Sequence, residues 1–438
     1  MKALSVILAG LLCSSAQAAT SDILFPRGGS SFSGAAGNVV FNGQQFVTPT
    51  VQSNGAIQFV FLDTNGVAVS NLSLSITGSS PRIVLNGSDF LLAWLNTNAV
   101  SSELNCARVA GGVTGAISVI GTNVANETIS LSGKGAPFVV IWQNADSNSI
   151  VLARTLDSNG RPTASSFAVS SSTQPQRYPS VDTDGTNFLV CWMEQNVTSN
   201  DWRVVARMIS NGAPVGPAFS VSDTNSLLPH ATACSFGTNY LVAWSQEAGL
   251  SSRLLSFLQQ SIPGSFLFED DRRYTNYWPI MIFTRIVSLS GALPSNPVIL
   301  SRNPYMNTNP AIVFGDGGYM IAWMNQNTFE TNPSSYELAY PLAQRVQRLH
   351  ADGTGWNYPI IMSPLSRQYR TVVAGFGAGR HCVLYVSATN TISYVFDRDN
   401  IEAPRLVNLR RNSSGGISVE STSVDYASDG FWRFRPTW

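Results

Sequence analysis

The densest group of side chains that could do chemistry lies between residues 269 and 278. Its acidic, basic and aromatic members are Glu269, Asp270, Asp271, Arg272, Arg273, Tyr274, Tyr277 and Trp278. Aromatic rings can stack on a sugar or a side chain, while Arg and carboxylate groups hold its polar atoms. A loop that packs on its own apolar residues would have the same composition. We interpret the segment as a ligand clamp and keep internal packing as the alternative.

Acid and amide side chains also recur just after a Trp at the end of several apolar runs. Glu194 follows Trp192, and Glu247 follows Trp244. We include both acids in the candidate ligand-binding set, although the repetition also favours a structural role in hydrogen bonding to backbone. A set of arginines recurs in a similar way and is interpreted as structural: Arg108, Arg154, Arg207 and Arg285.

The remaining polar residues do not form a recognised catalytic motif. His230, His350 and His381 fall in unrelated positions, which argues against a three-His metal site or a Ser-His-Asp triad. His381 stands where other repeats have Phe or Tyr, so we interpret it as a packed ring. The run from Asp182 to Gly185 is only part of a calcium loop. The sequence therefore gives no catalytic residue, metal site or cofactor.

The elements that position these residues are predicted by a repeat, an aromatic residue followed four places later by Trp. Its copies are Phe90/Trp94, Phe138/Trp142, Phe188/Trp192, Tyr240/Trp244, Tyr319/Trp323 and Phe434/Trp438, with degenerate copies at Phe46/Thr50 and His381/Tyr385. Successive copies start 44 to 79 residues apart. This spacing is typical of β-propeller blades, and the two longest intervals indicate insertions.

Each repeat predicts a four-stranded antiparallel sheet. Asn159-Gly160 and Asn211-Gly212 are hairpin turn signals between the third and fourth strands. The second strands are almost continuously apolar, so both of their faces must be covered, as they are between neighbouring propeller blades. We favour eight blades, in a ring closed by pairing Ile23–Phe25 with a C-terminal hairpin of residues 424–438. Seven blades are the alternative, if that hairpin caps the ring.

The connections that vary between repeats are expected at one face of the ring. Because strands alternate in direction, the loops after the second strands and between blades emerge together, opposite the tight turns. The largest insertion is the loop at about 245–279, which contains the charged and aromatic cluster. Variable loops on a rigid scaffold are where binding usually occurs.

Two runs resemble a known group of proteins. Gly185 to Trp192 and Gly237 to Trp244 both read Gly-x-x-Phe/Tyr-Leu-Val-x-Trp. This motif is similar to the repeat motif of secreted bacterial β-propeller repeat proteins. The resemblance implies a propeller fold and an extracellular location, and it transfers no catalytic residue.

Composition and the first residues bear on compartment and partners. The chain has 438 residues, of which 12% are charged, with 26 basic and 26 acidic residues, so it offers no electrostatic attraction to nucleic acid. Residues 1–18 read as a signal peptide that ends in Ala16-Gln17-Ala18. We therefore expect one secreted domain over 19–438, extracellular or periplasmic, monomeric and without a membrane span. Its four cysteines are read as buried thiols, with disulfide pairing left open: Cys106, Cys191, Cys234 and Cys382.

These observations favour a non-catalytic binding or adhesion propeller that recognises a glycan or an extracellular protein through its variable-loop face. The alternative is a carbohydrate-active hydrolase or lyase with a carboxylate pair on the same face. Two facing acids from different blades would favour the enzyme.

Overall fold

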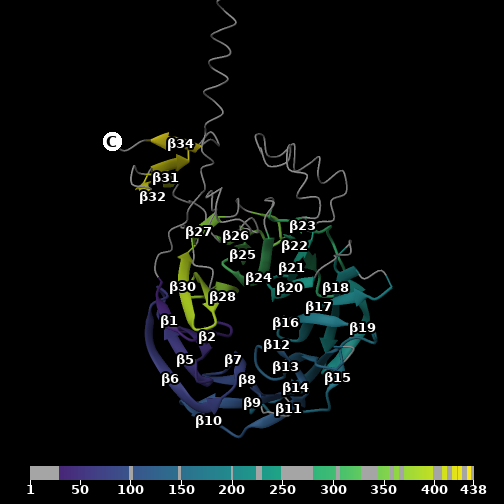
Figure 1. The fold of residues 1–438 in the computed structure, drawn as a ribbon. Coiled ribbons are helices and arrows are strands. Elements are labelled where there is room, and N and C mark those ends of the chain that lie inside the picture. The colour runs from purple at the N-terminus through teal and green to yellow at the C-terminus, as the bar shows by residue number, and fades with distance from the viewer. Residues whose placement is uncertain are drawn as a thin grey trace, which may run out of the picture.

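The computed structural model shows a ring of β-sheets, with no helix in the parts of the chain that it describes (Figure 1). Those parts are residues 29–97, 102–146, 149–198, 201–222, 229–247, 280–301, 306–326, 343–355, 360–364, 369–397, 407–411, 417–421, 423–426 and 432–435. The predicted signal peptide and most of the predicted insertion lie outside them. Within the described ranges, no helix suited to crossing a membrane is found.

Seven antiparallel sheets follow one another along the described chain, and we name them blades I to VII. In each, the first strand lies nearest the centre of the ring and the last lies at its rim (Figure 1). The strands are, in blade I, β2 (Ala35–Ala36), β3 (Val40–Phe41), β4 (Phe46–Val51), β5 (Ala56–Leu62) and β6 (Ala68–Thr77); in II, β7 (Ser79–Asn86), β8 (Asp89–Thr97), β9 (Ser102–Ala110), β10 (Val113–Thr114) and β11 (Ser118–Thr122); in III, β12 (Val124–Ser132), β13 (Phe138–Asn144), β14 (Val151–Leu156) and β15 (Phe167–Ala168); in IV, β16 (Gln176–Thr183), β17 (Asn187–Asn196), β18 (Asp201–Ser210) and β19 (Ala213–Ser220); in V, β20 (Pro229–Phe236), β21 (Tyr240–Glu247), β22 (Ile280–Val287) and β23 (Val298–Ile299); in VI, β24 (Met306–Gly315), β25 (Gly318–Gln326), β26 (Ala343–Leu349) and β27 (Ile360–Pro364); and in VII, β28 (Tyr369–Gly377), β29 (Arg380–Ser387), β30 (Asn390–Asp397) and β1 (Ser31–Ser33).

The prediction of eight blades is wrong, because the described residues form seven. The outer strand of blade VII is β1, which pairs antiparallel with β30. Since β1 occupies that edge, the C-terminal strands find no open edge there. In the described chain they pair only with one another, β31 (Val407–Arg411) with β32 (Ile417–Ser421) and β33 (Ser423–Tyr426) with β34 (Trp432–Arg435). Ile23–Phe25, the strand predicted to pair with them, lies outside the described residues.

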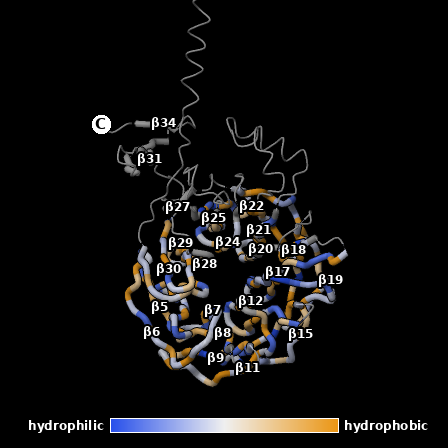
Figure 2. The backbone as a smooth tube through the Cα atoms, viewed as in Figure 1, coloured by the Kyte–Doolittle hydropathy of each residue, from blue (hydrophilic) through white to orange (hydrophobic). Residues whose placement is uncertain are grey.

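The apolar second strands are buried on both faces, as their composition predicts. In β17, Phe188 and Trp192 pack in one cluster with residues of blade III, whereas Leu189 and Met193 pack in another with residues of blade V. Because alternate side chains of a strand point to opposite faces, one second strand contributes to the apolar clusters on both sides of its blade. Hydrophobic stretches accordingly run through the strands of every blade instead of forming one layer (Figure 2). Blade VII packs on blade I in the same way.

Three of the four repeated arginines are structural in the same way, since each of them joins two blades. Arg207 donates from Nη1 to the backbone O of Val169 in blade III at 2.8 Å, and from Nε to Gly216 O in its own blade at 2.9 Å. Two other arginines make the equivalent pair of bonds: Arg154 to Ile120 O and Ala164 O, and Arg285 to Val221 O and Ser295 O. Arg108 differs and forms an ion pair with Asp89.

Candidate ligand-binding site

The variable connections meet at one end of the ring, which we call the variable face. In blade IV, Gln176 at the start of the inner strand pairs with Glu194 near the end of the second strand. The connections between blades and those after second strands therefore emerge at this end. The connection from β21 to β22 holds the predicted clamp. The clamp residues 269–278 lie outside the described residues, so their role stays a prediction.

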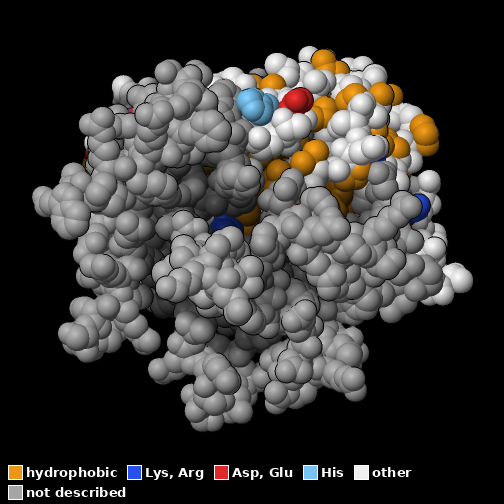
Figure 3. All heavy atoms as spheres, turned by 90° about the horizontal axis from the view of Figure 1, so that it is seen from above, with side chains coloured by type: hydrophobic (Ala, Val, Ile, Leu, Met, Phe, Trp, Pro, Cys, Tyr) orange, Lys and Arg blue, Asp and Glu red, His pale blue; other side chains and the backbone are white. Residues whose placement is uncertain are grey.

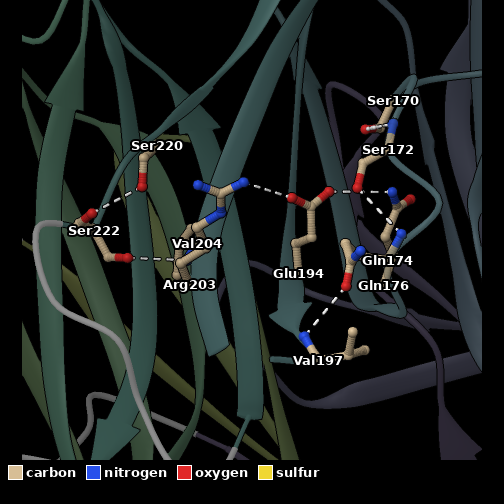
Figure 4. A network of polar contacts seen from close by, with 10 residues as sticks. All are labelled: Ser170, Ser172, Gln174, Gln176, Glu194, Val197, Arg203, Val204, Ser220 and Ser222. Carbon is tan, nitrogen blue, oxygen red and sulfur yellow. Dashed lines mark hydrogen bonds and ion pairs between the residues drawn. The ribbon is translucent and has the colours of Figure 1, made fainter. Parts of the chain in front are cut away.

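Glu194, a predicted ligand-binding residue, is tied into the blade (Figure 4). Its Oε1 accepts a hydrogen bond from Arg203 Nη2 at 2.8 Å, and its Oε2 accepts one from Gln176 Nε2 at 3.3 Å. Gln176 Oε1 in turn accepts the backbone N–H of Val151 in blade III at 2.7 Å. The Glu194 side chain is 3% exposed and that of Arg203 49%. The carboxylate therefore links strands and blades, and it offers little surface to a ligand.

A second polar residue after a Trp has a similar internal bond. Gln246 Oε1 accepts a hydrogen bond from the indole N–H of Trp244 at 2.8 Å. Glu247, the other acid in the predicted set, is the last residue of β21. The structure thus places Glu194 and Glu247 in neighbouring blades at the variable face, and it describes the contacts of Glu194 alone.

A feature that sequence reasoning missed is a repeated bulge in the inner strands of blades II, IV and VI. In each, two residues of the inner strand oppose the single repeat Trp of the second strand. The first has a positive φ and the second is proline: Ser80-Pro81 (φ 50°), Tyr178-Pro179 (54°) and Asn309-Pro310 (54°). In the sequence, each of these bulges is marked by a proline thirteen residues before the repeat Trp. The pairs are Pro81 and Trp94, Pro179 and Trp192, and Pro310 and Trp323.

Blades V and VII have a comparable irregularity close to the same end. The register of β20 shifts between Pro229 and Ala231, which places His230 at the irregular position. The register of β28 shifts between Tyr369 and Thr371, which places Arg370 there. Bulges are common next to functional sites because they re-aim a side chain. In these two blades the irregular residue lies beyond the position opposite Trp244 or Tyr385, on the side of the variable face.

Tyr178 is the most unusual of these bulge residues. A bulky side chain is rarely found with positive φ, and such strain concentrates at functional sites. Its backbone O accepts a hydrogen bond from Thr232 Oγ1 of blade V, which holds the bulge against the next blade. The Tyr178 side chain is 37% exposed although it belongs to an inner strand. The fold therefore holds an aromatic ring in a strained and solvent-accessible position.

Arg177, which precedes Tyr178, is exposed, and its guanidinium group lies over an aromatic ring. Its guanidinium carbon lies 5.3 Å from the centre of the Trp202 ring, within the range of a cation–π interaction. Among the described residues, the Arg177 side chain makes no hydrogen bond or ion pair. Charged side chains are few on the described surface seen in Figure 3, so an exposed arginine on an inner strand is distinctive. β16 therefore carries an exposed cation and an exposed aromatic ring at consecutive positions.

The acidic turn at the opposite end of blade IV is structural. Asp182 accepts hydrogen bonds from Ser132 Oγ at 3.0 Å and from the backbone N of Phe236 at 2.7 Å, and so joins the inner strands of blades III, IV and V. Burial raises the pKa of this carboxyl group. Asp184 accepts two backbone N–H groups within its own turn. In the described part of the chain, no three His, Cys, Asp or Glu side chains could together hold a metal ion.

His381 is a packed ring, as the repeat predicts. It is 1% exposed and lies 4.8 Å from the Phe376 ring, measured between centroids. Neither ring nitrogen has a hydrogen-bond partner among the described residues. Burial, together with the nearby Arg348 charge, lowers the pKa of His381 to about 3. The imidazole is therefore neutral at ordinary pH.

No family model matches the chain, and no curated protein matches it. Its chain path is similar to that of several solved structures. They include the polysaccharide lyase Uly1 (TM-score 0.46, 7% identity, covering 83% of this chain and 90% of that chain) and a prolyl endopeptidase (0.42, 8%, 91% and 55%). A third is the GH43_1 enzyme from Xanthomonas citri complexed with xylose (0.34, 11%, 52% and 85%). At these identities the likeness concerns the fold alone, and no residue role follows from it.

Proposed function

We propose that the protein is a secreted, non-catalytic binding propeller that recognises an acidic glycan at its variable face. The observation that carries the proposal is the pair Arg177 and Tyr178, which blade IV exposes at a strained bulge of its inner strand. A protein ligand with acidic side chains is the other outcome that a binding test would reveal.

The chemistry of the pair favours a sugar that carries carboxylate or sulfate groups. A tyrosine ring gives a flat apolar face on which a pyranose can stack, and it loses little conformational entropy when it binds. A guanidinium donates two parallel hydrogen bonds to a carboxylate or sulfate. Because Arg177 already rests on Trp202, part of the cost of ordering its long side chain is met before binding.

The bonding of Glu194 supports binding over glycoside cleavage. Cleavage by paired carboxyl groups needs one acid that can donate a proton and a second that can attack or activate water. Glu194 Oε1 is bonded to Arg203 and its Oε2 to Gln176, which favours a structural role for this carboxylate. A hydrolase or lyase that uses a different acid pair on the same face remains the second candidate.

A glycan array with uronate-bearing, sulfated and neutral members tests the proposal. We expect binding to acidic members and no new reducing or unsaturated ends when the bound glycan is incubated with the protein. Binding to neutral glycans only would contradict the ligand class, and time-dependent cleavage would favour the enzyme. Secretion after Ala18 and a monomeric state are proposals too, and N-terminal sequencing of exported protein and gel filtration test them.

A further inference from the structure

Two cysteines lie in the apolar cluster at the junction of blades IV and V. Cys191 lies on β17, directly opposite Ser180 of β16. Cys234 lies on β20, the inner strand of the next blade, and its backbone N donates a hydrogen bond to Ser180 Oγ at 3.2 Å. The Cys234 sulfur lies 3.6 Å from the same hydroxyl oxygen. One serine thus contacts Cys234 and stands opposite Cys191.

The Cys234 sulfur reaches the backbone of β17, the strand that carries Cys191. Cys234 Sγ donates to the backbone O of Leu189 at 3.7 Å, two residues from Cys191 along β17. Both cysteines belong to the one apolar cluster between these blades. Burial, followed by Cys191, raises the pKa of Cys234. Both cysteines are therefore buried, and the Cys234 thiol is held protonated, once the blades have packed.

The repeat does not require cysteine at either position. The residue just before the repeat Trp is alanine or isoleucine in four other blades: Ala93, Ile141, Ala243 and Ala322. The inner-strand position of Cys234, opposite the residue two before Trp, carries an aliphatic residue in four other blades: Ile83, Leu131, Val181 and Ile312. Two cysteines thus replace aliphatic residues on the two sides of one blade junction.

We propose that Cys191 and Cys234 form a disulfide between blades IV and V when the chain folds in the presence of a disulfide oxidant. With oxidised glutathione, one thiolate attacks the glutathione disulfide and releases one reduced glutathione. The second thiolate then attacks the mixed disulfide and releases another, so two thiols lose two protons and two electrons. The bond forms before the junction closes, since afterwards both sulfurs are buried. It joins the inner strand of one blade to the second strand of its neighbour.

Cys106 and Cys382 are matched internal controls. Both are buried free thiols, and they belong to two other clusters, at the junctions of blades II and III and of blades VII and I. Neither cluster contains a second cysteine. An oxidant that acted without selection would modify or pair these thiols too. The proposal expects them to stay reduced.

Peptide mapping of the full chain, refolded in oxidised glutathione and alkylated after denaturation, tests the proposal. We expect one cross-linked peptide pair through Cys191 and Cys234, with Cys106 and Cys382 alkylated. We also expect a reductant to lower the melting temperature by about 5 °C in the wild type and to have no effect in Cys191→Ala or Cys234→Ala. Alkylation of both Cys191 and Cys234, or a different pairing, would overturn it. The mapping uses wild-type protein, so poor folding of a variant does not affect it.

Discussion

Arg207 Nη1 donates a hydrogen bond of 2.8 Å to the backbone O of Val169, and this bond crosses from blade IV to blade III. Because Nε of the same guanidinium donates to Gly216 O, one side chain binds two backbone carbonyl groups from two blades. The equivalent bonds of Arg154 and Arg285 repeat this link between successive blades. Blade docking therefore depends on a few directional bonds as well as on apolar packing.

Replacing Arg207 by leucine should destabilise the ring. Two carbonyl groups lose their donors, and the expected loss in the free energy of unfolding is about 2 kcal/mol. Arg108→Leu is the matched control, because Arg108 forms an exposed ion pair worth less than about 1 kcal/mol. Urea denaturation of both variants measures the difference. Equal losses in the two variants would show that the hydrogen bond from Arg207 to blade III stabilises the fold no more than the Arg108 ion pair does.

His381 should make the protein sensitive to acid. Its pKa is about 3 when folded and near 6.5 when unfolded, so protons bind the unfolded chain first. Stability is therefore full above pH 6.5 and falls as the pH drops toward 3, by about 1.4 kcal/mol per pH unit from this group.

His381→Phe restores the residue type of the other repeats and should remove this loss. The variant should exceed the wild type by about 2 kcal/mol more at pH 5 than at pH 7. Urea midpoints at the two pH values give this difference. If the difference in the free energy of unfolding between variant and wild type is the same at both pH values, the His381 imidazole is not held neutral in the folded protein.

Much of the fold follows from sequence because burial on both faces leaves a clear pattern. The run from Phe188 to Trp192 predicts a second strand, and the structure confirms it. The error in blade number has a physical cause. Phe434 and Trp438 imitate a second strand, whereas β1, Ser-Phe-Ser, carries no apolar pattern to show that it completes blade VII. The sequence also gives no indication of the positive φ of Tyr178 except the proline that follows it.

The C-terminal hairpins should be dispensable for the stability of the ring. Within the described chain, β31 to β34 pair only among themselves, so a protein that ends at residue 406 should melt within about 2 °C of the full chain. Removal of residues 1–33, which deletes β1, should lower the melting temperature clearly because β30 loses its partner. Calorimetry of both truncations tests the assignment of seven blades. A large loss on C-terminal truncation alone would contradict it.

The predicted clamp should contribute to affinity and leave the ring intact. Deletion of residues 266–278 removes the charged and aromatic cluster from the connection between β21 and β22 of blade V, the blade that follows the one carrying Tyr178. We expect weaker binding on the glycan array and an unchanged melting temperature. Unaltered binding by the deletion variant would exclude a role for the cluster.

In the proposed function, Arg177 and Tyr178 of blade IV hold an acidic glycan. Tyr178→Gly separates binding from folding, because glycine tolerates the positive φ and removes the ring. Asn211→Gly, a positive-φ site in a turn at the opposite end of the blade, is the matched control.

Titration calorimetry of the three proteins with the strongest acidic glycan from the array is the most direct measurement. We predict that Tyr178→Gly folds with at least wild-type stability and binds roughly tenfold or more weakly, while Asn211→Gly binds like the wild type. We also predict that added salt weakens wild-type binding. Wild-type affinity in Tyr178→Gly would contradict the account.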